Sequence, residues 1–187
     1  DVETGFGRHQ GVALRRACAT GPVEDVEGLI PRLARDALLL VLDGVQDPHN
    51  LGACVRSADA AGAQAVIIPR DRAAPLTDVA RKAASGAAEH TPVLTVTNIS
   101  RTLRQLKDAG VWIIGTAATA EATIHTTDLV RPLALVLGGE GSGMRQNVQA
   151  QCDHVVRIPL HGHVESLNVS VAAGICLFEV RRQRGVV

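Results

Sequence analysis

The sequence contains very few aromatic residues: two phenylalanines, one tryptophan and no tyrosine among 187 residues. Proteins that hold single-stranded RNA usually stack its bases on several exposed aromatic side chains. A base-stacking platform of that kind is therefore not expected here. The formal net charge is zero, so the bulk charge does not indicate a nucleic-acid partner either.

The sequence also lacks any apolar run long enough to span a membrane, although 46% of its residues are hydrophobic. It shows no signal peptide and begins at Asp1 without a methionine, as expected of a processed chain or a fragment. Its four cysteines lie far apart and form no CxxC pair: Cys18, Cys54, Cys152 and Cys176. This spacing favours reduced thiols in the core of a cytoplasmic protein over disulfides or a zinc site.

From residue 37 onward, short apolar runs alternate with helical patterns, and no internal repeat interrupts them. The strands expected are 38–42, 65–68, 93–96, 111–115, 133–137 and 155–158. The helices expected are 53–61, 76–88, 100–109, 145–151 and 168–182. This alternation predicts an α/β fold with a mostly parallel sheet and helices on both faces.

Residues 1–36 are interrupted by glycine and proline, and only 11–14 and 26–33 have a regular pattern. We interpret 1–36 as an arm or linker, or the remnant of a preceding domain, and 37–187 as the main domain.

Three polar turns, 47–56, 137–144 and 164–174, follow or adjoin the expected strands. In open parallel sheets, ligands bind beyond the carboxyl ends of the strands. These turns lie at such ends, after Asp43, Leu137 and Ile158, so we expect them to converge on one site.

The turn LGGEGSGM, residues 137–144, contains Gly139-x-Gly141-x-Gly143. Glycines there permit positive φ and a close approach of backbone to a ligand, although a simple tight turn needs them as well. A dinucleotide fingerprint belongs after the first strand with an acidic residue about 20 positions later, and this turn has neither feature. Glu140 stands between two glycines, either as a functional carboxylate or as a solvated one.

Polar side chains in the other two turns have similar alternatives. Arg56 lies one helical turn after Gly52, where it either binds a phosphate or ribose hydroxyl or pairs with Asp59 or Asp43. Ser166 and Asn168 precede the last helix, where they cap it or turn toward a ligand.

The histidines do not make a metal site, because His161-x-His163 and His49 lack a further ligand at firm spacing; we expect no metal. Exposed cations on the expected helices and loops either contact phosphates or are simply solvated. They are Arg70, Arg72, Arg81, Lys82, Arg101, Arg104 and Lys107.

Together, the three turns resemble the SpoU family of SPOUT-type RNA ribose methyltransferases. The matching motifs are Asn50-x-Gly52-x-x-x-Arg56, LGxEGxG at 137–143 and IP…SLNVS at 158–170. The resemblance covers about residues 37–185, and LDGVQDPHNLGACVRSADAAGA and SLNVSVAAGICLFE are most similar to family members that methylate a guanosine 2′-hydroxyl in large-subunit ribosomal RNA. HQGVA, at 9–13, resembles the end of that subgroup's RNA-binding domain.

The resemblance implies a deep C-terminal trefoil knot, an exception to the rule that chains are unknotted. It further implies an obligate homodimer and the cofactor S-adenosylmethionine, bound in the knotted loops. Carried over by position, the cofactor-lining residues are Thr116, Leu137, Gly138, Gly141, Ile158, Leu160, Leu167 and Asn168.

The resemblance also implies a catalytic set made of Asn50, Arg56, Glu140, Ser166 and Asn168. In the family the arginine helps to deprotonate the ribose 2′-hydroxyl. Because arginine stays protonated in proteins, two roles remain open for Arg56: a base aided by an RNA phosphate, or a group that orients the hydroxyl and stabilises developing alkoxide charge.

The expected function is therefore methylation of a 23S rRNA guanosine. The alternatives are a non-catalytic RNA-binding or ribosome-assembly factor, a tRNA ribose methyltransferase and a nucleotide-dependent oxidoreductase. The intact catalytic set argues against a pure binding protein.

Overall fold

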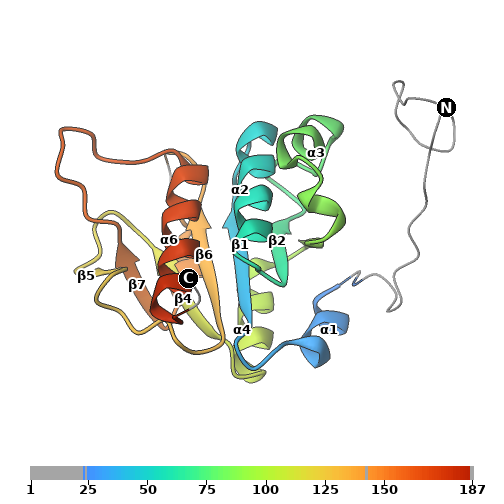
Figure 1. Ribbon diagram of the computed structural model, residues 1–187, viewed down its shortest axis with the longest axis horizontal. Helices are drawn as coiled ribbons and strands as arrows, with labels where there is room; N and C mark the ends of the chain where they lie inside the picture. Colours follow the sequence, from blue (N-terminus) through green and yellow to red (C-terminus); the bar gives the residue numbers. More distant parts are fainter. Residues whose placement is uncertain (1–22, 24, 142, 186–187) are drawn as a thin grey trace, which may run out of the picture.

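The structure is a computed structural model that describes residue 23, residues 25–141 and residues 143–185. Its seven strands form one sheet in the order β3-β2-β1-β6-β4-β7-β5, and every neighbouring pair is parallel (Figure 1). The strands are β1 (Leu38–Asp43), β2 (Ala65–Pro69), β3 (Val93–Val96), β4 (Trp112–Thr116), β5 (Ala122–Thr123), β6 (Leu133–Gly138) and β7 (His154–Arg157). The predicted α/β fold with a parallel sheet is confirmed.

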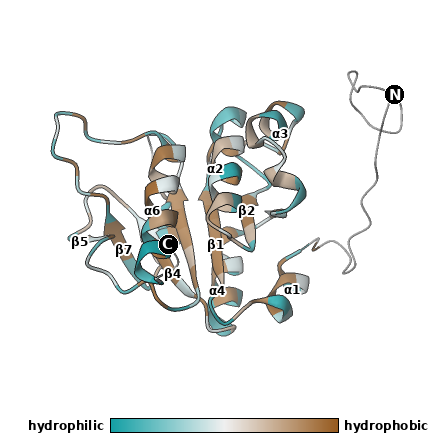
Figure 2. Ribbon diagram, viewed as in Figure 1, coloured by the Kyte–Doolittle hydropathy of each residue, from teal (hydrophilic) through white to brown (hydrophobic). Residues whose placement is uncertain are grey.

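Helices cover both faces of the sheet. The α-helices are α1 (Val26–Leu29), α2 (Pro48–Ala60), α3 (Asp78–Ala84), α4 (Ile99–Asp108), α5 (Gln146–Gln149) and α6 (Val169–Gln183), and the 3₁₀ turns are η1 (Ile30–Arg32) and η2 (Ala87–Glu89). The core on one face includes residues of α2, α3 and α6, and the core on the other includes residues of α1, α4 and α5. Figure 2 shows the sheet as the most hydrophobic layer between them.

Strand β1 belongs to both cores. All six of its residues are buried; Leu38, Leu40 and Leu42 belong to one core, whereas Leu39 and Val41 belong to the other. Successive side chains of a strand point to opposite faces, so a continuous apolar run is what a strand covered on both faces requires.

Most predicted boundaries are correct to within one residue, but three helices and one strand differ. The helix predicted at 145–151 is α5, which ends two residues earlier than predicted, at Gln149. Helix α2 begins five residues before the predicted start, because Asp47 caps it by accepting a hydrogen bond from the backbone N–H of His49 and Pro48 fits its first position. The helix predicted at 76–88 is the shorter α3, followed by η2. Strand β5 was not predicted, since its two residues form no apolar run.

The segment predicted as an arm, 1–36, is described only in part. The pattern at 26–33 is regular, as α1 and η1, and Val26 and Leu29 are buried in the core that also contains Leu39. The pattern at 11–14 lies outside the described residues. The division at residue 36 and the knot stay predictions. Among the described residues, no helix combines the length and hydrophobicity needed to cross a bilayer.

A buried carboxylate ties α6 to the loop before β6. The Glu179 side chain is only 6% exposed and accepts hydrogen bonds from Arg182 at 2.7 and 2.9 Å and from Gln183 at 2.9 Å. His125 Nδ1 lies 3.3 Å away, and Gln183 in turn accepts from the backbone N–H of Leu129. The hydrogen bonds from Arg182, supported by Gln183 and His125, lower the pKa of Glu179 to about 2.

This lowered pKa predicts a loss of stability in acid. The ordinary pKa of 4.5 applies to the unfolded chain, so the stabilisation from ionised Glu179 is complete above pH 4.5 and disappears as the pH falls toward 2. We expect Glu179→Gln to lower the free energy of unfolding at pH 7 by about 2 kcal/mol. Urea unfolding from pH 7 to 3 should show the gap between the two proteins closing; a gap that is constant with pH would contradict the assignment.

Candidate functional site

Side chains from the three predicted turns meet at the carboxyl edge of the sheet. Asn50, in the first turn of α2, donates from Nδ2 to Glu140 Oε1 at 2.5 Å. Its Oδ1 accepts from Asn168 Nδ2 at 3.0 Å. Asn168 caps α6, because its Oδ1 accepts from the backbone N–H of Ser170 at 2.9 Å. The convergence expected from the sequence is therefore confirmed. The two hydrogen bonds that link Glu140, Asn50 and Asn168 join residues 90 and 118 positions apart in the sequence.

Asn50 lies inside the helix rather than just before it, which corrects the prediction. The earlier start of α2 at Pro48 places the Asn50 side chain on the first helical turn, held by the capped end. A side chain on a helix is positioned more rigidly than one on a loop.

The glycine-rich turn folds tightly back on itself. A Cβ added to Gly138 would lie 2.0 Å from the carbonyl carbon of Gly143, and one added to Gly139 would lie 2.3 Å from the carbonyl oxygen of Gly44. Gly141 has a φ of 80° and Gly143 a φ of 65°. Two of these glycines thus serve close backbone packing, as a tight turn requires, and two provide positive φ.

An ion pair between Arg145 and a buried carboxylate fixes the far end of this turn. The Asp43 side chain is fully buried and its Oδ1 accepts from Arg145 Nε at 2.8 Å and Nη2 at 2.5 Å, while its Oδ2 accepts from the Arg145 backbone N–H at 2.9 Å. Asp43 is therefore the partner of Arg145, not of Arg56. Charge-assisted, bidentate pairs of this kind are geometrically specific, so the glycine turn is held between β1 and β6.

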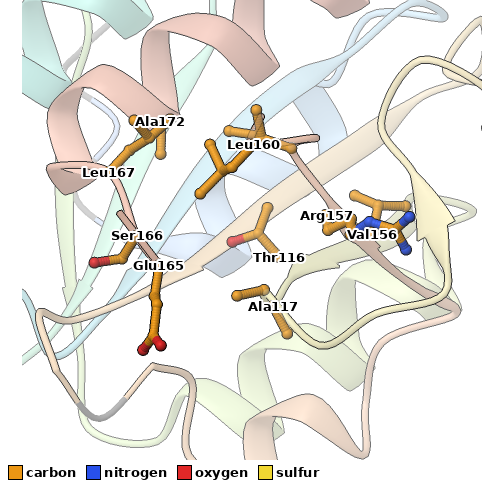
Figure 3. A pocket seen from close by; sticks show the side chains of 11 residues that line it. Thr116, Ala117, Val156, Arg157, Leu160, Glu165, Ser166, Leu167 and Ala172 are labelled. Carbon is orange, nitrogen blue, oxygen red and sulfur yellow. The ribbon is translucent and has the colours of Figure 1, made fainter. Parts of the chain in front are cut away.

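A pocket of about 130 Å³ opens next to the hydrogen-bonded residues Asn168, Asn50 and Glu140 (Figure 3). Its lining residues are Thr116, Ala117, Ala118, Val156, Arg157, Ile158, Leu160, Glu165, Ser166, Leu167 and Ala172. In Figure 3, Glu165, Ser166 and Leu167 of the loop before α6 line one side, and Val156 and Arg157 of β7 line another. Its lining combines apolar side chains with a few polar and charged ones, as small-molecule and cofactor sites do.

Half of the predicted cofactor residues line this pocket: Thr116, Ile158, Leu160 and Leu167. The other four, Leu137, Gly138, Gly141 and Asn168, are not among its lining residues. Leu137 is 2% exposed in the core, and Gly138 ends β6 opposite Asp43 of β1. Their assigned contact with a cofactor stays a prediction.

Sequence reasoning missed six lining residues, and two of them are charged. Arg157 donates to the backbone carbonyls of Ala120 and Glu121 at 2.6 and 2.7 Å, so its charge holds the loop after β4. Glu165 is exposed and makes no hydrogen bond or ion pair within the described part of the chain. Arg157 follows from no motif and ends β7, which pairs with β4. Glu165 lies beside Ser166 in the predicted turn 164–174, but no role was predicted for it.

Arg56 is exposed and lies outside this pocket. Its Nη1 is 3.4 Å from Ser85 Oγ, a hydrogen bond at the limit of useful length. Neither predicted ion pair forms: Asp43 binds Arg145, and Asp59 accepts from Thr91 Oγ1 at 3.0 Å. The guanidinium is therefore weakly held on α2, the helix that also carries Asn50.

The described cysteines are unpaired thiols. Burial raises the pKa of Cys54 and Cys176 to about 12 and that of Cys152 to about 11. A thiol is a nucleophile only as the thiolate, so these thiols are poor nucleophiles at neutral pH. Cys18 lies outside the described residues. No group of three or more metal-ligating side chains occurs in the described ranges.

Solved structures share this architecture. The SpoU methyltransferase AviRb from Streptomyces viridochromogenes, in complex with the cofactor AdoMet, has a TM-score of 0.81 and 27% identity, over 89% of this chain and 67% of that one. The A. aeolicus TrmH/SpoU tRNA modifying enzyme has a TM-score of 0.73 and 29% identity, over 86% and 84%.

Sequence relatives are more similar still. A Yersinia pestis protein named 23S rRNA (guanosine-2'-O-)-methyltransferase RlmB is 52% identical over 187 residues, covering 100% of this chain and 76% of that protein. A Burkholderia sp protein of the same name is 58% identical over 181 residues, covering 97% and 73%. The model of the SpoU rRNA Methylase family matches residues 37–178. With this match and these relatives, the chain belongs to the SpoU rRNA methylase family.

Proposed function

We propose that this chain is an S-adenosylmethionine-dependent RNA 2′-O-ribose methyltransferase that acts on a guanosine of 23S rRNA. The observation that carries the proposal is the pocket beside the Glu140–Asn50–Asn168 chain, at the carboxyl edge of a SpoU-family sheet. Relatives that are 52–58% identical bear this activity in their names. Such a substrate places the protein in the cytoplasm.

The residues present fit this cofactor. Apolar side chains such as Ile158, Leu160 and Leu167 suit the faces of an adenine ring, and the unpaired Glu165 carboxylate suits a cationic group. The side chain of Thr116, which lines the pocket, is held in place because its Oγ1 donates to the Val136 carbonyl at 3.2 Å. When bound, S-adenosylmethionine supplies a methyl group carried on a sulfonium. We assign Thr116, Ile158, Leu160 and Leu167 to side-chain contacts and Leu137, Gly138, Gly141 and Asn168 to backbone contacts.

The catalytic residues of this proposal act by orientation and electrostatics. Asn50, Glu140 and Asn168 already hold one another and form a polar rim for a ribose. Ser166 lines the pocket next to that rim. Arg56 orients the 2′-hydroxyl and stabilises its developing negative charge, the role that a permanently protonated guanidinium performs best.

The separation of Arg56 from the pocket supports a homodimer. Val171 and Phe178, two turns apart on α6, are 51% and 52% exposed although they are apolar. Helix α2 packs beside α6, where a Cβ on Gly174 would lie 3.9 Å from Ser57 Oγ. A second copy seated on this apolar face would cover both side chains and bring Arg56 toward the pocket of its partner.

Three competing functions make different predictions. A non-catalytic RNA-binding factor needs no cofactor pocket, and an oxidoreductase would bind a nicotinamide, which neither this strand order nor the place of the glycine turn favours. The likeness to the A. aeolicus tRNA enzyme favours a tRNA substrate, but the identity there is 29%, against 52–58% for the proteins named for 23S rRNA.

Calorimetry with S-adenosylmethionine and with NAD separates these classes. We expect one S-adenosylmethionine per chain and no heat with NAD. Ala117→Trp should abolish binding because it fills the pocket, whereas Thr119→Trp, an exposed position two residues later, should leave binding unchanged. Binding of NAD, or equal affinity of the two variants for S-adenosylmethionine, would contradict the proposal.

A further inference from the structure

Four exposed cations lie on α3 and on the loop that leads to it: Arg70, Arg72, Arg81 and Lys82. Arg70 has one weak partner, Asp71, at 4.0 Å, with both side chains more than 60% exposed. The side chains of the other three make no hydrogen bond or ion pair with any described residue. We call these four residues the α3 cation surface; their charges are not used in ion pairs within the described part of the protein, apart from the weak contact of Arg70 with Asp71.

The fold does not need these charges. Helix α3 packs on α2 through Ala80 and Ala84, which are both fully buried, with Gly52 against the Ala80 carbonyl. The helix dipole favours Arg81 and Lys82 in the last turn, but it gives no reason for arginines in the preceding loop. Arg72 even has a φ of 59°, a left-handed conformation that disfavours residues other than glycine, asparagine and aspartate.

The α3 cation surface is continuous with the candidate site. On one side, the Arg72 carbonyl lies 3.7 Å from the Cβ position of Gly44, and Gly44 packs against Gly139, the neighbour of Glu140. On the other side, Arg56 Nη1 lies 3.4 Å from Oγ of Ser85, the residue that caps the end of α3, shortly after Arg81 and Lys82. Cations thus run from the catalytic residues outward across α3.

Charge on this strip is locally positive although the whole chain is neutral. Within residues 70–84, which form the loop before α3 and α3 itself, the four cations accompany two acids, Asp71 and Asp78. Exposed arginine and lysine side chains without partners are the groups that contact nucleic-acid phosphates, and such contacts set register without reading sequence.

We propose that the α3 cation surface binds the phosphate backbone of the RNA substrate and guides it toward Arg56 and Glu140. This inference rests on the proposed function, because it takes RNA as the substrate. It adds the direction of approach: the RNA crosses α3, on the sheet face that carries α2 and α6, and not α4 on the opposite face.

The test compares two variants with the same change in charge. Arg72→Ala/Lys82→Ala removes two cations from the surface, and Arg101→Ala/Arg104→Ala removes two exposed cations from α4. Binding of a fluorescent RNA hairpin of mixed sequence is measured from 50 to 300 mM KCl for both variants and the unmodified chain. Calorimetry with S-adenosylmethionine and urea unfolding show that each variant keeps its fold and pocket.

The logarithm of the binding constant falls linearly with the logarithm of the salt concentration, and each phosphate contact makes this slope steeper by about 0.7–0.9. We expect the slope of the α3 variant to be shallower by about 1.5 than that of the unmodified chain, because two contacts are lost. The α4 variant should keep the slope of the unmodified chain. Two single variants test the same point if the double variant unfolds. Lys82→Arg should keep the slope of the unmodified chain, and Lys82→Glu should make it shallower. The inference would be overturned if neither double variant changed the slope. It would also be overturned if both variants lost the same amount, because a change in bulk charge alone explains that result. If the unmodified chain binds S-adenosylmethionine but no RNA, the RNA substrate fails together with this inference.

Discussion

Replacing Arg56 with alanine is expected to lower the rate of methyl transfer by about 10²–10³-fold, the usual cost of removing one preorganised group that stabilises transition-state charge. Binding of S-adenosylmethionine should not change, because Arg56 does not line the pocket and its side chain hydrogen-bonds Ser85 instead. Single-turnover assays with radiolabelled cofactor measure the rate, and calorimetry measures cofactor binding. Arg104→Ala, an exposed arginine on α4, is the matched control and should retain full activity.

The same variant also tests whether Arg56 acts across a dimer. Mixed with Ala117→Trp, which loses the pocket but keeps Arg56, it should regain part of the activity, because a mixed dimer then contains one complete site. Full activity of Arg56→Ala alone would remove its catalytic role. If the mixture regains no activity, Arg56 acts at the pocket of its own chain.

Gly138→Ala is expected to reduce the free energy of unfolding by about 3 kcal/mol or more, near the upper end of overpacking effects. The new Cβ would lie 2.0 Å from the Gly143 carbonyl carbon and 2.1 Å from the Met144 nitrogen. Both atoms belong to the backbone, so no side chain can rotate away, and the glycine turn must move. Because this turn carries Glu140, activity should fall as well.

Gly162→Ala provides the control for that experiment. A Cβ there meets nothing within 4 Å, and the residue does not have positive φ, so stability should stay within about 0.5 kcal/mol of the unmodified chain. Urea unfolding at pH 7 measures both variants. Equal stability of the two would show that the turn is more adaptable than its close packing indicates.

Local sequence patterns were sufficient for the sheet and for the convergence of the turns. The run at 38–42 indicated a strand covered on both faces, and β1 is buried throughout. Because parallel strands end at one edge, the polar residues after them were expected to meet, and Asn50 bonds both Glu140 and Asn168. These results depend on periodicity and chain direction alone.

Long-range pairing accounts for what the patterns did not predict. Arg145 binds Asp43 across 102 positions, and nothing local distinguishes it from Arg56, for which that partner was considered. Arg157 lies at the pocket because β7, which it ends, lies beside β4. The two-residue strand β5 exists by pairing with β7, without an apolar pattern of its own.

The most direct test of the proposed activity is transfer of a labelled methyl group to protein-free 23S rRNA and to tRNA, with the modified nucleotide mapped. We predict a single 2′-O-methylguanosine in 23S rRNA, no product in tRNA, and loss of the product in Ala117→Trp. Methylation of tRNA alone, or cofactor binding with no methyl transfer to either RNA, would contradict the assignment.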